Sequence, residues 1–133
     1  MRYRYVAYSY TKKTQLLDAY SAVWESFRAW PAPSAIIWRP PTDVYETAVD
    51  IVIVMELAGV MEENMTVTLF SDILVVEGRR DQPVFVDAHS CHQLGIKYGN
   101  FRSEVGLVSP VDHESVIAEY QNGLLEIRLR KLL

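Results

Sequence analysis

Side chains that could bind a metal or react with an oxidant cluster at one place in this chain. His89, Cys91 and His92 lie close together in one short stretch. A thiolate with two imidazoles would suit zinc or copper. Their spacing matches no common zinc signature and no fourth ligand is apparent, so we predict no metal site. Cys91 is the only cysteine, which excludes an internal disulfide and leaves an intermolecular disulfide or redox sensing open.

Motifs for nucleophilic or phosphoryl-transfer catalysis are missing from the sequence. No serine lies in a nucleophile elbow, and no glycine-rich loop carries a lysine that could hold phosphates. We therefore predict that the protein is not an enzyme, does not hydrolyse ATP and needs no cofactor.

The length of 133 residues allows one domain with a short extension. Half of the residues are hydrophobic and 23% are charged, as in globular proteins. No uncharged apolar run is long enough to cross a bilayer as a helix, so we expect no membrane partner. The first residues run into tyrosines instead of an apolar signal core, which favours a cytoplasmic location.

The net charge of −4 conceals two oppositely charged regions. The residues up to Pro40 include six basic and two acidic side chains, whereas the remainder includes seven basic and fifteen acidic ones. An acidic body argues against a nucleic-acid partner. The basic arm could be attracted to the body, or these charges could simply solvate two surfaces.

The segment from Thr14 to Trp30 has apolar residues at three- and four-residue intervals, which predicts an amphipathic helix in the N-terminal arm. Its aromatic stripe could dock on the body or on a partner. Alternatively, intermittent exposure would let the stripe capture unfolded chains by apolar burial. The candidate client-binding residues are Tyr20, Trp24, Phe27 and Trp30.

Prolines near residue 40 mark the boundary between an arm, residues 1–40, and a domain, residues 41–133. Beyond this boundary apolar residues alternate with polar ones, as in strands. Strands are expected from Asp43 onward and over residues 49–57, 65–70, 73–77, 101–107, 115–120 and 124–131. Ser71-Asp72 and Asn122-Gly123 mark tight turns between them. This pattern predicts an all-β, immunoglobulin-like antiparallel β-sandwich.

The order of several short motifs resembles the α-crystallin domain of small heat-shock proteins over about residues 42–131. In the strongest match an alanine is followed, after a four-residue gap, by a glycine and two apolar residues. The matching segments are Asp43 to Thr47, Glu56 to Val60, Leu74 to Arg80, Tyr98 to Phe101 and Ala118 to Ile127. Within them, Gly59 and Gly78 are expected where strands turn.

This resemblance implies an ATP-independent holdase chaperone that binds aggregation-prone unfolded proteins in the stress response. Two alternatives stay open: an adaptor with a related CS-type sandwich, as in co-chaperones, and a modulatory subunit that joins other small heat-shock proteins. The long segment from Asp81 to Asn100 and the Gly123-Leu124-Leu125 match favour the holdase over the adaptor.

The resemblance also implies a homodimer, because a connection of this length carries a strand exchanged between subunits in bacterial and plant family members. Part of Val84 to Ile96 is expected to add to the partner's sheet near Asp43 to Thr47. The candidate interface residues are Val44, Tyr45, Val84, Phe85, Val86, His92 and Leu94.

Four departures from the family pattern limit these inferences. Ala58 replaces a usual proline, which should only soften a turn. Gly95 replaces an acidic residue and Ser103 an arginine, which weakens any inference of ion pairs across the dimer. The chain stops at Leu133 without an isoleucine-any-isoleucine tail. That ending argues against large assemblies, although an oligomer above the dimer stays open.

In the family, the tail motif fills a groove between the strands that correspond to residues 65–70 and 115–120. The candidate lining residues are Val67, Leu69, Val116 and Ala118. Ile36 and Trp38 are one candidate for the occupant, because residues two apart in an extended segment point the same way. The alternative is that both residues only pack at the edge of the sandwich.

Overall fold

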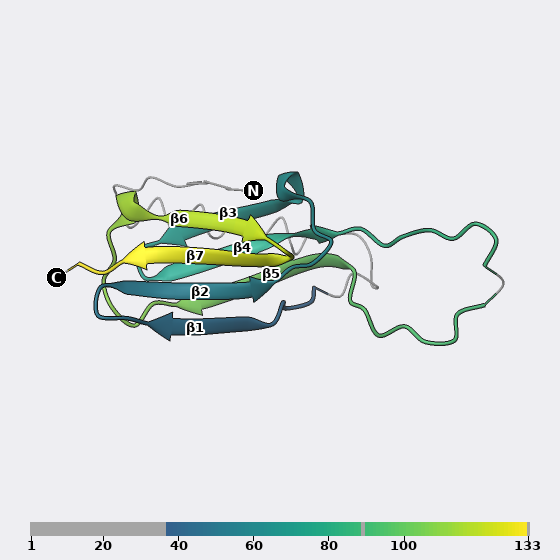
Figure 1. The fold of residues 1–133 in the computed structure, drawn as a ribbon, viewed down its shortest axis with the longest axis horizontal. Helices are drawn as coiled ribbons and strands as arrows, with labels where there is room; N and C mark the ends of the chain where they lie inside the picture. The colour runs from purple at the N-terminus through teal and green to yellow at the C-terminus, as the bar shows by residue number, and fades with distance from the viewer. Residues whose placement is uncertain (1–36, 89, 133) are drawn as a thin grey trace.

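The computed structural model describes residues 37–88 and 90–132, and within them two antiparallel sheets pack face to face (Figure 1). The predicted β-sandwich is confirmed. The predicted helical arm, with its four aromatic residues, lies outside the described residues. The strands are β1 (Thr42–Glu46), β2 (Asp50–Glu56), β3 (Met65–Phe70), β4 (Ile73–Arg80), β5 (Gly99–Gly106), β6 (Ile117–Gln121) and β7 (Leu124–Arg130).

One sheet has the strand order β1-β2-β7-β6 and the other the order β3-β4-β5. Short 3-10 turns, η1 (Glu62–Asn64) and η2 (His113–Ser115), precede β3 and β6. Strands β1 and β6 are therefore the edges of the larger sheet, and β3 and β5 are the edges of the smaller one. The edges matter for function because unpaired backbone groups can accept another strand.

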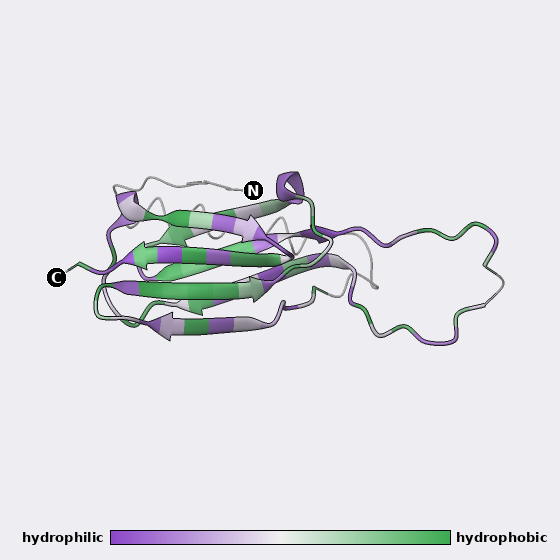
Figure 2. Ribbon diagram, in the orientation of Figure 1, coloured by the Kyte–Doolittle hydropathy of each residue, from purple (hydrophilic) through white to green (hydrophobic). Residues whose placement is uncertain are grey.

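Alternation along the strands builds the core between the sheets, and Figure 2 shows apolar bands along β2 and β4 and alternating ones along β7. Ile53 of β2, Ile127 of β7 and Leu74 of β4 are fully buried. Removing each such side chain from water contributes about 1.5–3 kcal/mol to stability. The alternating residues of β7, among them Arg128, face outward.

The second strand begins one residue later than the sequence pattern suggests. Val49, expected on the buried side of this strand, precedes β2 and is 43% exposed. The cause is a local turn, in which the hydroxyl oxygen of Thr47 accepts hydrogen bonds from the amides of Val49 and Asp50, at 3.2 and 2.8 Å. Threonine side chains commonly bond the backbone in this way at turns.

The turn between β6 and β7 has the geometry that the sequence predicts. Asn122 and Gly123 have φ values of 54° and 77°, which a tight two-residue hairpin turn requires. The carbonyl of Gly123 accepts a hydrogen bond from the amide of Leu57 at 2.7 Å. The hairpin between β6 and β7 is thus bonded to Leu57, the residue that directly follows β2.

Gly78 corrects the expectation that this glycine marks a turn. It lies inside β4, paired with Phe101 of β5. A Cβ atom on Gly78 would fall on the carbonyl oxygen of Asn64 and 2.8 Å from Cζ of Phe101. Glycine is needed here because the backbone that enters β3 approaches β4 closely, and β4 can therefore continue to Arg80.

Trp38 corrects the prediction that it occupies a groove between β3 and β6. It forms a parallel bridge with Phe101 of β5, at the edge of the smaller sheet opposite to β3. The amide of Trp38 donates to the carbonyl of Asn100 and its carbonyl accepts from the amide of Arg102, both at 3.1 Å. Its buried ring lies 5.4 Å from that of Phe101, centroid to centroid. Packing at the sandwich edge is therefore correct for Trp38, and Ile36 lies outside the described residues.

Candidate dimer interface and exposed apolar surface

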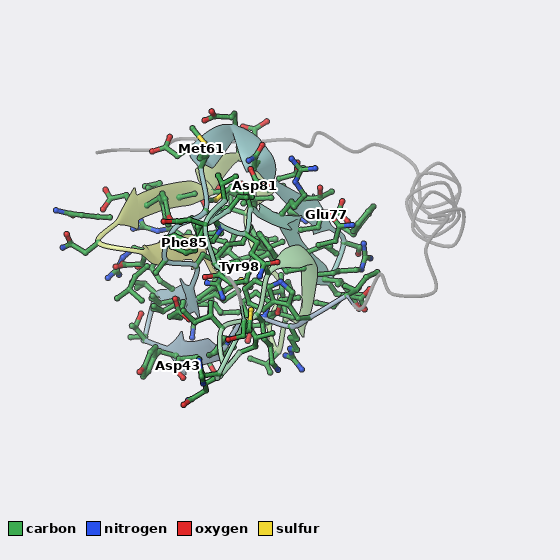
Figure 3. The ribbon with its side chains drawn as sticks, turned by 90° about the vertical axis from the view of Figure 1, so that its right-hand side faces the viewer. Asp43, Met61, Glu77, Asp81, Phe85 and Tyr98 are labelled. Atoms are coloured by element: carbon green, nitrogen blue, oxygen red, sulfur yellow. The ribbon has the colours of Figure 1, made fainter. Side chains whose placement is uncertain are left out.

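The connection between β4 and β5 projects beyond the end of both sheets (Figure 1). Its described residues, 81–88 and 90–98, form neither helix nor strand. Four predicted interface residues on it are strongly exposed: Val84 by 83%, Phe85 by 72%, Val86 by 95% and Leu94 by 73%. Figure 3 looks toward this end of the molecule and labels Phe85. A contiguous set of exposed apolar side chains is typical of an interaction site.

The outer edge of β1 is the second predicted part of the interface. Within the described residues, β1 pairs only with β2, so one row of its backbone groups has no partner strand. Val44 and Tyr45 on this strand are 50% and 56% exposed. The connection does not lie along β1 within one chain (Figure 1). The two predicted halves of the interface are thus both accessible and separate in a single subunit.

Ser103 and Ala58 replace two residues typical of the family, and both have defined local roles. The Ser103 side chain is buried, and its hydroxyl oxygen lies 3.3 Å from that of Thr42 on β1. The Ala58 amide donates to the Glu56 carboxylate at 2.9 Å. A proline at residue 58 could not make this bond because it has no amide hydrogen. Gly95 lies in the exposed connection.

The cluster of histidine and cysteine shows no metal geometry in the part of the chain that is described. Cys91 and His92 are exposed, and Nε2 of His92 lies 3.4 Å from the hydroxyl oxygen of Ser90. His89 is not among the described residues. Among those that are, no three or more His, Cys, Asp or Glu side chains are grouped to hold a metal ion. The described residues also include no helix that is long and apolar enough to cross a membrane.

The four predicted groove residues come together in the core. Val67 and Leu69 on β3, Val116 just before β6 and Ala118 on β6 are all buried and belong to one apolar cluster. The two strands are edges of opposite sheets. That these residues line a groove for an isoleucine-containing segment stays a prediction.

An ion-paired cluster on the outer face of the smaller sheet was not predicted. Arg102 on β5 lies 2.9 Å from the Glu77 carboxylate and 2.8 Å from that of Glu104. Alternation places Arg102 outward, yet only 6% of its side chain is exposed. Burial raises the pKa of Glu77, although the charge of Arg102 opposes this shift. Figure 3 labels Glu77 at the side of the domain.

The raised pKa of Glu77 gives a pH prediction whose sign is opposite to that of an ordinary salt bridge. The raised pKa means that the folded state disfavours the ionised carboxyl of Glu77. Glu77 therefore lowers the stability of the fold least when the pH is below the pKa of this carboxyl in the unfolded chain. The loss of stability is complete once the pH has risen through its pKa in the folded state. We therefore expect the stability of the parent protein relative to Glu77→Gln to increase from pH 7 to pH 4. Urea unfolding of both proteins at the two pH values measures this difference, and a decrease would contradict it.

A two-sheet sandwich with a long connection before β5 and an open β1 edge defines an α-crystallin-type domain. The family model for the Hsp20/alpha crystallin family matches residues 43–133. The chain belongs to this family.

Relatives and solved structures agree with this assignment. The chain is 33% identical over 95 residues to small heat shock protein C4 of Rickettsia felis, covering 71% of this chain and 58% of that protein. Small heat shock protein C2 of the same organism is 24% identical over 92 residues, 69% of this chain and 60% of that protein. The matched part of the chain thus spans about three fifths of these relatives.

Among solved structures, hspA from Xanthomonas axonopodis superimposes with a TM-score of 0.65 and 26% identity, covering 72% of this chain and 96% of that chain. Heat shock protein 16.0 from Schizosaccharomyces pombe gives a TM-score of 0.65 at 24% identity, over 71% of this chain and 87% of that chain. The latter likeness concerns the fold alone.

Proposed function

We propose that the protein is an ATP-independent holdase that binds aggregation-prone, unfolded proteins during stress in the cytoplasm. The observation that carries this proposal is the match of residues 43–133 to the small heat-shock family, on a sandwich whose exposed connection and open β1 edge are suited to pairing subunits. Apolar burial is non-directional, so it suits a chaperone that accepts many client sequences. The proposed activity requires neither catalysis nor a cofactor.

The working unit in this proposal is a homodimer formed by strand exchange. Part of Val84 to Ile96 adds to the free edge of β1 in the partner, beside Val44 and Tyr45, and pairs the open backbone groups there. This arrangement would cover apolar side chains that are exposed in the single chain. The proposal is supported by an open edge and a protruding apolar segment on the same subunit.

Clients are proposed to bind the aromatic stripe of the N-terminal arm, which lies outside the described residues. Tyr20, Trp24, Phe27 and Trp30 are the candidate contacts. These residues are distant in sequence from the connection, so client binding and subunit contact would use different side chains.

Light scattering of a heated model client without nucleotide tests the holdase directly. We expect an equimolar amount of subunits to reduce aggregation at least about twofold, because apolar contacts of about 25 cal/mol per Å² compete with client self-association. The double substitution Trp24→Ser and Phe27→Ser should remove most of this protection. Val108→Ser is the matched control, since Val108 is 74% exposed but lies outside the arm and the connection.

Unchanged aggregation at several-fold molar excess of the parent protein would refute the holdase function. In that case the alternative is that the protein is a modulatory subunit of other small heat-shock proteins. The same assay with a second small heat-shock protein present would then show a change in the second protein's activity.

A further inference from the structure

Arg80 is a buried cation at the base of the connection, where β4 ends. Its Nε and Nη2 atoms donate to the carbonyl of Lys97, at 2.9 and 2.7 Å. Its Nη1 atom donates to the carbonyl of Ala58 at 3.1 Å. The guanidinium of Arg80, at the end of β4, is thus bonded to Lys97, which lies shortly before the start of β5.

The faces of the same guanidinium meet aromatic rings. The central carbon of Arg80 lies 4.4 Å from the ring centroid of Trp38 and 5.8 Å from that of Tyr98. Trp38 is itself held by a hydrogen bond of 3.2 Å from its indole nitrogen to the carbonyl of Gly99. Cation–π attraction is strongest with tryptophan and increases when the pair is withdrawn from water.

These contacts require an arginine. A lysine has a single nitrogen and no planar group, so it could not bond two carbonyls in this fork and stack on a ring. The neighbouring Arg79 is a natural contrast. It pairs with Asp81 at 2.8 Å, and both side chains are more than half exposed, so that pair should contribute little.

We propose that Arg80 couples the linker before the sandwich to the base of the Asp81–Tyr98 connection. When the Trp38 ring rests on Arg80, the base of the connection is held closed. When Trp38 leaves, water reaches the guanidinium and its bonds to Lys97 weaken. The inference rests on the proposed function in one respect, namely that this connection carries the strand exchanged between subunits.

The consequence for the dimer is control of subunit exchange by the segment that precedes the sandwich. A cavity at the base is lined by residues of the linker and of both ends of the connection, among them Trp38, Arg39, Arg80, Pro83, Ile96 and Tyr98. A pull on the linker, as when the arm binds a client, would therefore loosen the segment that joins the subunits. Arg80 and Trp38 are positioning residues in this mechanism.

Subunit exchange can be followed through a cysteine placed outside the connection, in a background that combines Cys91→Ser with Val108→Cys, because Val108 is 74% exposed. One sample of the full-length protein is labelled there with a donor dye and another with an acceptor dye, and the two samples are mixed. The rate at which energy transfer between the dyes increases after mixing gives the rate of subunit exchange. We expect Trp38→Leu and Arg80→Met each to accelerate exchange about tenfold, which corresponds to about 1.4 kcal/mol. The double variant should exchange no faster than either single variant, because both remove the same link. Arg79→Met is the control and should change the rate less than twofold.

Hydrogen exchange of the same full-length proteins separates this proposal from the proposed dimer. Peptides covering residues 97–104 should lose protection in Trp38→Leu and Arg80→Met but not in Arg79→Met, because the amide of Arg102 donates to the carbonyl of Trp38. This loss is expected even if no dimer forms. Trp38→Phe keeps an aromatic ring and serves if the leucine variant does not fold, with a smaller loss expected. Unchanged protection, or fully additive effects of the two substitutions, would overturn the coupling.

Discussion

Replacing Gly78 with alanine is expected to lower the free energy of unfolding by about 3 kcal/mol, because an extra methyl group in a packed region forces the backbone to move. The added atom would fall on the carbonyl oxygen of Asn64, which is main chain and cannot turn aside. It would also press on the ring of Phe101, one of the fully buried core side chains. Thermal and urea unfolding measure the loss.

Gly106→Ala is the matched control for this substitution. Gly106 ends β5, no heavy atom would lie within 4 Å of its added Cβ, and its φ is not positive. Surface substitutions of this kind usually change stability by less than about 0.5 kcal/mol. If Gly78→Ala had the same unfolding midpoints as Gly106→Ala and the parent protein, the η1 backbone would not lie close to β4 as described.

The second large effect concerns the proposed dimer. We expect Val84→Asp combined with Phe85→Asp to weaken dimerisation at least about a hundredfold, or about 2.7 kcal/mol. Neighbouring residues of a strand point to opposite faces. Whichever face of the exchanged strand is buried, the double substitution therefore places one carboxylate in an apolar contact, where it loses its hydration.

Sedimentation of the full-length protein at a series of concentrations measures this dissociation constant. Val108→Asp adds a charge at a similarly exposed valine outside the connection and should leave the constant unchanged. A dimer of parental affinity in the double variant would show that Val84 and Phe85 do not form the interface.

Periodicity in the sequence was enough to predict the sandwich, because most strands present a clear inner face. The alternation of Leu125, Ile127 and Leu129 with charged residues leaves one arrangement that buries the apolar set. The turn at Asn122-Gly123 was predictable for a different reason, since few residue pairs accept two positive φ values.

The features that sequence reasoning missed depend on contacts between distant segments. Trp38 joins β5 by a single parallel bridge, which is too short to create a periodic pattern. Arg102 is in an outward position of β5 but is buried with Glu77, and alternation alone predicts exposure there. Gly78 looked like a turn residue because glycine is common in turns. In the structure, glycine is needed at this position because the backbone of Asn64 lies too close to allow a side chain. The client-binding, groove and interface residues stay predictions.

The position of Trp38 also bears on where the autonomous folding unit begins. The match to the family model starts at residue 43, but Trp38 and Pro40 already belong to the buried interior. A fragment cut at residue 43 would leave the ring of Phe101 and the guanidinium of Arg80 without the Trp38 ring that covers them. The stretch that the family model covers is therefore shorter than the stretch that the fold needs, and the difference is supplied by residues that look like a spacer.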